Sequence, residues 1–301
     1  MTVLVTGAGG FVGQGLVGYL ARTRPDEPLH VCDLTAPPSA GSVTGHALDV
    51  TDRRAVSALV DKLRPDLVIH AAALTRTAPE DRLAVFDVNM TGSLNVLQSA
   101  NATGVARIIV ASSSGIYADT PAKLRREDDP LDVTNAYAAS KSAAEAIAAT
   151  YGGYAVRIGP VYGPNETARP SRPRISAVGR LHDHLRRQMP IMICGGAITR
   201  DWTHVDDIAA GIDALARSPA PRHHVYNLSA GQPFSLLNVA AEFARHGLIV
   251  QETDDPTQAD IIQRPQDARP PLSLDRLRTD TDFAPHHTLE TGIAAVISSS
   301  L

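Results

Sequence analysis

A glycine-spaced turn at the start of the chain constrains the fold more than any other feature. Residues 3–5 form a short apolar run of the kind that makes a buried parallel strand. Gly7, Gly10 and Gly13 follow at three-residue intervals, and apolar residues then recur at helical spacing as far as Leu20. A strand, a glycine turn and a helix in this order are typical of a dinucleotide-binding unit. A glycine-rich turn without a ligand is the alternative interpretation.

Each glycine has its own expected role in such a unit. Gly7 permits a tight turn out of the strand, Gly10 lets the backbone approach a pyrophosphate, and Gly13 lets the helix pack closely on the strand. The free N–H groups at the start of the helix then face the phosphate charge. We therefore expect this turn to bind the cofactor through Gly7, Gly10, Phe11, Val12 and Gly13.

An acidic residue at the end of the next predicted strand indicates which dinucleotide is bound. Residues 29–32 predict a second strand, and Asp33 follows it, twenty positions beyond Gly13. A carboxylate at that distance can accept hydrogen bonds from the adenosine ribose hydroxyls. Residues 34–40 contain no Arg or Lys, so a 2′-phosphate would meet a carboxylate and no cation. This favours NAD over NADP. A turn-capping role for Asp33 is the alternative.

Bulk properties exclude several classes of protein. The formal net charge of the 301 residues is -4, so a nucleic-acid partner is not expected. Cys32 and Cys194 form no spacing motif, which suits a reducing cytoplasm better than a disulfide framework. The first strand begins at residue 3, which leaves no room for a signal peptide, and no apolar run is long enough to span a membrane. We expect a cytoplasmic protein.

A second motif predicts the chemistry. Residues 108–111 predict a strand that ends in three consecutive serines, 112–114. Tyr137 and Lys141 lie four residues apart at the start of an alanine-rich helix, so they share a face. An ammonium beside a phenol favours the phenolate and lowers its pKa, which makes Tyr137 a usable general acid and base.

These residues carry a family resemblance. The chain resembles the extended short-chain dehydrogenase/reductases of the NAD-dependent epimerase/dehydratase family, of the UDP-glucose 4-epimerase type. The matching segments run in family order along essentially the whole chain. They are Thr6 to Gly13, Asp33, Asp49 and Val50, His70 to Ala73, Asn89, Ser112 and Ser113, Tyr137 to Lys141, Arg157, Val161 to Pro164, Arg200 to Asp207, and Arg264 to Arg269.

The resemblance implies roles for individual residues. Tyr137 is the implied acid/base, Lys141 holds the nicotinamide ribose and biases Tyr137, and Ser113 orients the reacting oxygen. Ser112 and Ser114 are the alternatives to Ser113. The implied cofactor contacts are Asp33, Asp49, Val50, Ala71, Ala72, Ala73, Asn89, Tyr137 and Lys141. The implied substrate contacts are Ser113, Ser114, Arg200 and Arg269. From its apolar neighbours alone, the Asn89 side chain could also face solvent.

Two positions depart from the family pattern. Family members that dehydrate sugars carry Asp-Glu after the catalytic hydroxyl residue, whereas this chain has Ser114 and Gly115, which disfavours a 4,6-dehydratase. Many sugar-nucleotide enzymes carry Asn before Val-Tyr-Gly-Pro, where this chain has Pro160, which lacks both an N–H and a side-chain donor. Pro160 therefore argues against a nucleotide-sugar substrate, while Arg200 and Arg269 argue for one.

Charged residues beyond residue 163 leave two readings open. Six arginines, Arg169, Arg172, Arg174, Arg180, Arg186 and Arg187, form either a solvated basic face or an anion-binding wall over the site. The histidine pairs lack the companion ligands of a metal site, so we expect surface residues and no metal. These pairs are His182 with His184, His223 with His224, and His286 with His287.

The combined prediction is an α/β protein with a doubly wound, mainly parallel Rossmann sheet and a smaller carboxyl-terminal substrate lobe. Residues 1–160, with later strands from about 190–230, are expected to form the NAD-binding domain, and residues 161–301 mainly the lobe. The predicted function is an NAD-dependent epimerase or oxidoreductase acting on a secondary alcohol of a sugar-like, anionic substrate. A dehydrogenase of a small hydroxy acid, lactone or free sugar is the alternative, followed by a catalytically silent NAD-binding regulator. The resemblance also implies a homodimer.

Overall fold

The computed structural model describes residues 1–76, 78–120, 122–169 and 171–299. Its larger part is a seven-stranded sheet in the order β11-β6-β5-β4-β1-β2-β3, in which all neighbouring strands run parallel. The strands are β1 (Val3–Thr6), β2 (Leu29–Asp33), β3 (Val43–Ala47), β4 (Leu67–His70), β5 (Arg107–Ser113), β6 (Tyr154–Ile158) and β11 (Val225–Leu228). The chain starts in the middle of this sheet and winds to both edges, which confirms the predicted doubly wound fold.

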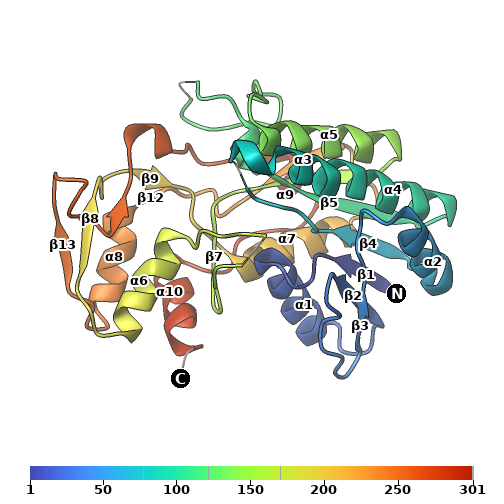
Figure 1. Cartoon of the computed structure of the whole chain (residues 1–301), viewed down its shortest axis with the longest axis horizontal. Coiled ribbons are helices and arrows are strands. Elements are labelled where there is room, and N and C mark those ends of the chain that lie inside the picture. Colours follow the sequence, from blue (N-terminus) through green and yellow to red (C-terminus); the bar gives the residue numbers. More distant parts are fainter. Residues whose placement is uncertain (77, 121, 170, 300–301) are drawn as a thin grey trace.

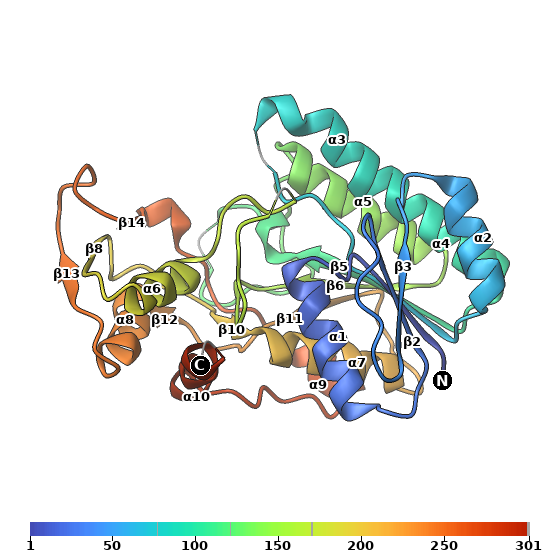
Figure 2. The ribbon, with the colours of Figure 1, turned by 60° about the horizontal axis from the view of Figure 1, so that its bottom comes forward.

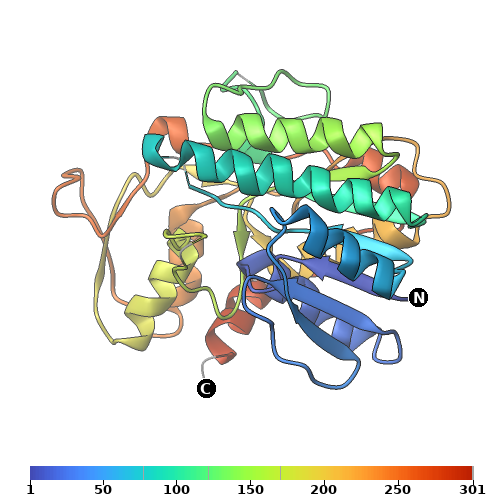
Figure 3. The same ribbon diagram turned by 45° about the vertical axis from the view of Figure 1, so that its right-hand side comes forward.

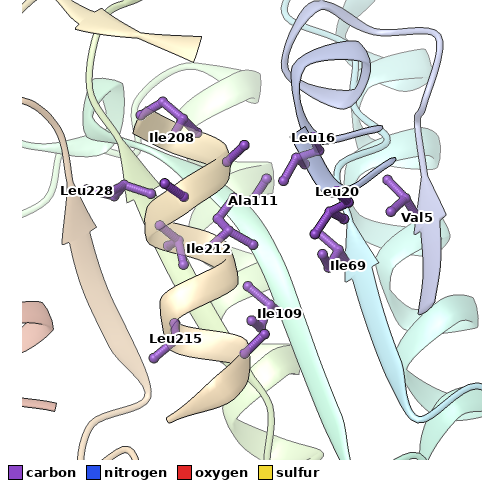
Figure 4. Close-up of a cluster of buried hydrophobic side chains, with 14 of the residues drawn as sticks. Val5, Leu16, Leu20, Ile69, Ile109, Ala111, Ile208, Ile212, Leu215 and Leu228 are labelled. Carbon is purple, nitrogen blue, oxygen red and sulfur yellow. The ribbon is translucent and has the colours of Figure 1, made fainter. Parts of the chain in front are cut away.

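Helices cover both faces of the sheet (Figure 1). The first face is covered by α1 (Phe11–Thr23), α7 (Val205–Arg217) and the short α9 (Asp275–Asp280), and the second by α2 (Arg53–Leu63), α4 (Gly92–Ala102) and α5 (Ala136–Thr150). Strand residues alternate between two cores, with Val3 and Val5 in one and Leu4 in the other. Figure 4 shows the first core, where Leu16 of α1 and Ile212 of α7 face the sheet. Within the described residues, every helix is too short or too polar to cross a bilayer.

The second face carries a long helical rod. The helix α3 (Arg82–Phe86) continues through a π-helical turn, η2 (Asp87–Thr91), into α4, and α5 lies beside it (Figure 3). Asn135 caps α5, because its side chain accepts the Ala138 N–H at 2.9 Å. This cap fixes the first turn of α5, on which Tyr137 stands.

The carboxyl-terminal lobe has its own core (Figure 2). It packs α6 (Ala177–Arg186), α8 (Leu236–Ala244) and α10 (Leu289–Ser298) around a small sheet of β13 (Val250–Glu252), β8 (Ile191–Cys194) and β14 (Ile261–Ile262). Two short sheets connect the lobe to the larger domain. They pair β7 (Val161–Tyr162) with β10 (Thr203–His204), and β9 (Thr199–Arg200) with β12 (Phe234–Ser235).

The structure corrects the expected domain division at one strand. Strands from about residue 190 were expected in the Rossmann sheet, but β8 lies in the lobe and, of the described strands after residue 190, only β11 joins the large sheet. The reason lies in burial. Ile191 and Ile193 are buried while Met192 and Cys194 are partly exposed, so β8 has one apolar face. That one face packs into the core of the lobe.

Candidate active site

The glycine turn lies against the carboxyl end of β4. Gly7 has a φ of +73°, and a Cβ there would collide with the backbone of Ala72. A Cβ at Gly13 would collide with the carbonyl of Gly7, so helix and turn can pack closely only through glycine. Helix α1 has Gly10 as its amino-terminal cap and no side chain on its first N–H groups. These groups, including those of Phe11 and Val12, therefore remain available to an anion.

Two of the cavities that border this turn share Gly10, Ala71, Ala73 and Ser171. The first, of about 220 Å³, also brings together the predicted pyrophosphate and catalytic residues, namely Phe11, Val12, Gly13, Ser113, Tyr137 and Lys141. The second, of about 100 Å³, is lined by the predicted adenosine-side residues Gly7, Asp33, Asp49, Val50 and Ala72, together with Leu34, Leu48, Leu74 and Val88. Segments that lie far apart in sequence thus form one elongated cleft at the carboxyl ends of the strands.

The catalytic candidates converge from two elements. Ser113 ends β5, and Tyr137 and Lys141 stand one turn apart on α5. A hydrogen bond links the Ser113 hydroxyl to the Tyr137 phenol. Lys141 is buried and its Nζ donates to the Ala111 carbonyl at 2.7 Å. Of the three serines, Ser113 is therefore the one placed at the phenol.

The pKa of the Tyr137 phenol is shifted in the opposite direction to the one that the sequence predicts. Burial raises the pKa of the Tyr137 phenol, and the hydrogen bond from Ser113 and the charge of Arg172 lower it in part. The predicted lowering by Lys141 is therefore wrong for this structure, where Lys141 is turned to the Ala111 carbonyl. Burial lowers the pKa of Lys141 to about 8, against the opposing effect of the Glu145 carboxylate.

A buried ion pair supports the site from behind, and sequence analysis missed it. Arg157 of β6 and Glu145 of α5 form a bidentate pair, with Nη2 to Oε2 at 2.7 Å and Nε to Oε1 at 2.9 Å. The Ser112 hydroxyl donates to Glu145 Oε1 at 2.5 Å. This network joins the end of β5 to the helix that carries Lys141. The sequence signal that could have pointed to Glu145 is its spacing of four residues from Lys141, which places both side chains on one face of the helix.

Asn89 has a different place from either expectation. Its side chain is 1% exposed, accepts the Leu74 N–H at 2.7 Å, and donates to the Leu74 carbonyl and the Ser140 hydroxyl. It lines neither cavity described above. The solvent-facing interpretation is therefore wrong, and a direct cofactor contact by Asn89 stays a prediction. Asn89 holds the segment after β4 in place, because the π-helical turn directs its amide inward.

His70 belongs to a buried hydrogen-bond chain at the end of β4. The Ser93 hydroxyl donates to the Asn89 carbonyl, so its oxygen accepts from His70 Nε2 at 3.0 Å. His70 Nδ1 then accepts from the Thr6 hydroxyl at 2.6 Å. This arrangement holds a neutral imidazole, and burial lowers the pKa of His70 to about 3.

His70 is expected to make the protein acid-sensitive. Below its ordinary pKa of 6.5, the unfolded state binds a proton that the folded state refuses, so stability falls with falling pH. The contribution is about 1.4 kcal/mol per pH unit between pH 6 and pH 4. Urea unfolding of wild type and His70→Gln at pH 7 and pH 5 measures it. An equal loss of stability in both proteins would contradict this assignment.

A third cavity, of about 160 Å³, adjoins the first through consecutive residues. Ser113 and Gly159 line the first cavity, and Ser114 and Pro160 line the third. Arg269 also lines this third cavity, so Ser114 and Arg269 come together as predicted for a substrate site. The remaining lining residues include Tyr117, Asp119, Arg125, Asp132 and Asn135.

Arg200 lies outside these cavities. Its Nη2 is 3.7 Å from Asp267 Oδ1, and its guanidinium is 5.8 Å from the Trp202 ring. Its Nε is buried and has no hydrogen-bond partner among the described residues. Arg200 and Arg269 lie close together, because the Arg269 N–H donates at 3.1 Å to the carbonyl of Thr199, the residue before Arg200. Burial lowers the pKa of Arg200, and the charge of Arg269 lowers it further against the opposing effect of Asp267. The structure therefore places both predicted arginines on the lobe side of the cleft.

The six arginines after residue 163 divide into two groups. Arg169 and Arg172 are partly buried and turn toward the glycine turn, where Arg169 donates to the Gly9 carbonyl and Arg172 lines the first cavity. The other four, Arg174, Arg180, Arg186 and Arg187, are exposed or partly exposed and line none of the three cavities. The solvated basic face thus describes the four exposed arginines, and the anion-binding wall stays a prediction for Arg169 and Arg172.

The histidine pairs are not simple surface residues, because His182, His184, His223 and His287 are each partly buried. His287 is partly buried and stacks on His204 with ring centroids 3.9 Å apart, while its Nδ1 lies 3.2 Å from Asp207 Oδ1. His204, Asp206 and His287 bring their ligand atoms within 4.8 Å of one another. However, stacked rings direct their in-plane lone pairs side by side, and His204 Nδ1 already accepts the Asp206 N–H. We therefore assign no metal to this cluster.

Comparison with known proteins places the chain in a family. A model of the NAD-dependent epimerase/dehydratase family matches residues 3–229. A UDP-glucuronate 4-epimerase from Thermodesulfobacterium geofontis (strain OPF15) is 30% identical over 258 residues, which cover 77% of this chain and 76% of that protein. A dTDP-glucose 4,6-dehydratase from Streptomyces griseus is 26% identical over 323 residues, covering 98% and 93%. A UDP-glucose 4-epimerase from Thermus thermophilus, solved with NAD, has a TM-score of 0.82 at 25% identity, covering 99% and 98%.

The chain therefore belongs to the NAD-dependent epimerase/dehydratase family, as the motifs predicted. Its cofactor is NAD. The cleft fits this group, because the glycine turn leaves the amino end of α1 open to a diphosphate and Asp33 stands at the far cavity. Asp33 Oδ1 and Oδ2 accept the N–H groups of Leu34 and Gly9 and keep lone pairs for ribose hydroxyls.

Proposed function

We propose that the chain is an NAD-dependent epimerase that inverts a secondary alcohol of a nucleotide sugar. One observation carries the proposal. Ser113, Tyr137 and Lys141 line the same cavity as the glycine turn, and a polar cavity containing Arg269 adjoins it. Bound NAD supplies a reversible hydride acceptor. The protein's own task is then to hold the alcohol and move its proton.

The geometry supports a division of labour among the three residues. In its ionised form, the Tyr137 phenolic oxygen takes the hydroxyl proton of the substrate as hydride leaves to NAD, and the resulting phenol returns the proton at the end of the reaction. The Ser113 hydroxyl, hydrogen-bonded to the phenol, holds the reacting oxygen in place. Lys141 Nζ is fixed at the end of β5 by the Ala111 carbonyl and brings a positive charge to the ribose side of the cleft.

Residues beside the site disfavour dehydration. Water elimination from a sugar needs a positioned acid and base next to the catalytic hydroxyl residue. Here Ser114 and Gly115 hold those positions and supply neither group. The 4,6-dehydratases among the relatives are therefore a less suitable guide than the 4-epimerases.

Pro160 favours a second candidate function. It lines the cavity next to Ser114 and offers no hydrogen-bond donor to a nucleotide. A dehydrogenase of a small hydroxy acid, lactone or free sugar would need no such donor, and Arg269 could hold its carboxylate. Arg200 and Arg269, which lie together on the lobe side, favour the nucleotide sugar instead.

A substrate panel decides between these functions. Purified protein with NAD is incubated with UDP-, dTDP- and GDP-linked hexoses and hexuronates, and with free sugars, lactones and hydroxy acids. Both NADH absorbance and epimer composition are measured. An epimerase interconverts epimers without net NADH, and a dehydrogenase accumulates NADH in proportion to product. A 4-keto-6-deoxy product, or NAD binding without any turnover, would overturn the proposal.

We also propose that two copies of the chain pair through the α3–α4 rod and α5. Leu83, Met90 and Leu94 point outward from the rod at helical spacing, with 73%, 38% and 40% of their surface exposed. The exposed side of α5 carries small residues such as Ala143 and Ala146, which let another helix approach closely. Figure 3 shows these two helices side by side. A second copy of the same surface would cover the apolar side chains.

A charge on this surface is expected to separate the copies. Leu94→Arg should weaken association at least about tenfold, because a buried unpaired guanidinium is costly. Sedimentation velocity over a concentration series measures the change. Ile249→Arg, at a residue 62% exposed on the lobe, is the matched control and should leave the assembly unchanged. A wild-type monomer would contradict the pairing.

A further inference from the structure

The segment around Ser171 spans the cofactor cleft. The Ser171 carbonyl accepts the Thr75 N–H at 3.0 Å and the Thr75 hydroxyl at 3.1 Å, on the side of the cleft after β4. On the other side, Arg169 donates to the Gly9 carbonyl and to Gln14 Oε1. Ser171 therefore lines both the first and the second cavity.

Arg172 is held firmly beside this bridge. Its Nη2 lies 2.7 Å from Glu166 Oε1, and the Glu166 side chain is only 2% exposed. Glu166 also accepts the Ser176 N–H at 2.7 Å and the Ser176 hydroxyl at 2.6 Å. The Arg172 guanidinium carbon lies 4.9 Å from the centre of the Phe11 ring. Charge pairing on one side and ring stacking on another fix the orientation of the guanidinium.

One end of this guanidinium is left without a partner. Nη1 of Arg172 is buried and makes no hydrogen bond to any described residue. An unpaired buried donor on a charged group is unfavourable, so such an atom indicates a missing acceptor. The cavity that Arg172 lines also contains the open amino end of α1, at Phe11 and Val12. The Arg172 side chain and the amino end of α1 thus border the same cavity.

We propose that Arg172 binds the diphosphate of the dinucleotide and closes the anion site opposite the amino end of α1. A diphosphate carries acceptor oxygens on two sides, so the helix amides hold one side and the guanidinium the other. Phosphate is the class of ligand that suits a fixed guanidinium fork. The inference rests on the NAD dependence of the family and not on which sugar reaction follows.

Binding measurements without turnover test this assignment. Calorimetric titration with NAD and with ADP-ribose is compared for wild type, Arg172→Met and Arg174→Met. Arg174 lies two residues away and is exposed, so it is a matched control for the loss of one charge. We expect Arg172→Met to weaken both ligands about 10- to 100-fold, since a hydrogen bond to a charged group has that effect. Adenosine, which lacks the diphosphate, should bind all three proteins equally.

Two further variants distinguish the loss of a contact to NAD from a folding defect. Arg172→Lys retains the charge without the fork, and Glu166→Gln removes the ionic anchor; both should give smaller losses of NAD affinity than Arg172→Met. Equal NAD affinity in Arg172→Met and Arg174→Met would overturn the proposal. So would a rise in substrate KM in Arg172→Met with unchanged NAD affinity, because the guanidinium would then hold an anion of the substrate. An inactive protein that still shows the expected affinities would count against the proposed epimerase and not against Arg172.

Discussion

Replacing Tyr137 by phenylalanine should lower the turnover number about 100- to 10,000-fold, the usual contribution of a positioned general acid/base. The substitution removes only the phenolic oxygen, which receives the Ser113 hydrogen bond at the cavity wall. Without it, no described group stands at the Ser113 hydroxyl to take the proton of the substrate alcohol. The rate of epimer interconversion, measured on the substrate found in the panel, is the readout. NAD affinity should change far less than the turnover number, because the amino end of α1 binds the diphosphate independently of the phenolic oxygen.

Tyr151→Phe provides the matched control. It makes the same chemical change at the carboxyl end of α5, away from the cleft, and should alter turnover by less than about twofold. Ser113→Ala should have an intermediate turnover number. We expect a loss of about 10- to 100-fold, because the variant lacks one hydrogen bond to a charged oxygen. Near-normal turnover in Tyr137→Phe would remove Tyr137 from the mechanism and, with it, the proposed reaction.

Replacing Arg157 by methionine should lower the free energy of unfolding by about 3–5 kcal/mol, the usual effect of breaking a buried ion pair. Arg157 and Glu145 are 4% and 6% exposed, and the substitution leaves the Glu145 carboxylate buried with only the Ser112 hydroxyl and the nearby Lys141 charge. Arg157 also donates to the Glu127 carbonyl at 2.8 Å, and that bond is lost as well. Urea unfolding at neutral pH measures the change.

The double variant Glu145→Gln/Arg157→Met separates charge from packing. Removing both charges should recover at least about half of the lost stability, because the uncompensated buried carboxylate is gone. Arg187→Met breaks an exposed pair with Asp183 and should cost less than about 1 kcal/mol. If the double variant is as unstable as Arg157→Met alone, the destabilisation comes from lost packing and the ion-pair explanation is wrong.

The fold was predictable because its signals are local. The glycine turn and the apolar strands each act within a few residues, and helices link the parallel strands as such a pattern predicts. The grouping of Ser113, Tyr137 and Lys141 was predictable for a related reason. Residues at the carboxyl ends of neighbouring parallel strands and at the start of the following helix must meet at one edge of the sheet.

The remaining features depend on contacts between distant segments. Asn89 is inward-facing because a π-helical turn shifts the helical register, and composition does not record that shift. The distinction between Arg172 and Arg174 depends on Glu166, which anchors only the former. The position of β8 in the lobe depends on its pairing with β13 and β14, which follow it in the chain by more than fifty residues. In each case, the observed structure depends on contacts between residues far apart in the chain, and a local sequence pattern does not record those contacts.

The last strand of the large sheet, β11, comes from chain that has already passed through the smaller lobe. A protein cut between the two regions would leave β6 as a bare edge and would lack α7, whose Ile208 and Ile212 cover the sheet. The two regions are therefore not separable modules that recombination could exchange between relatives.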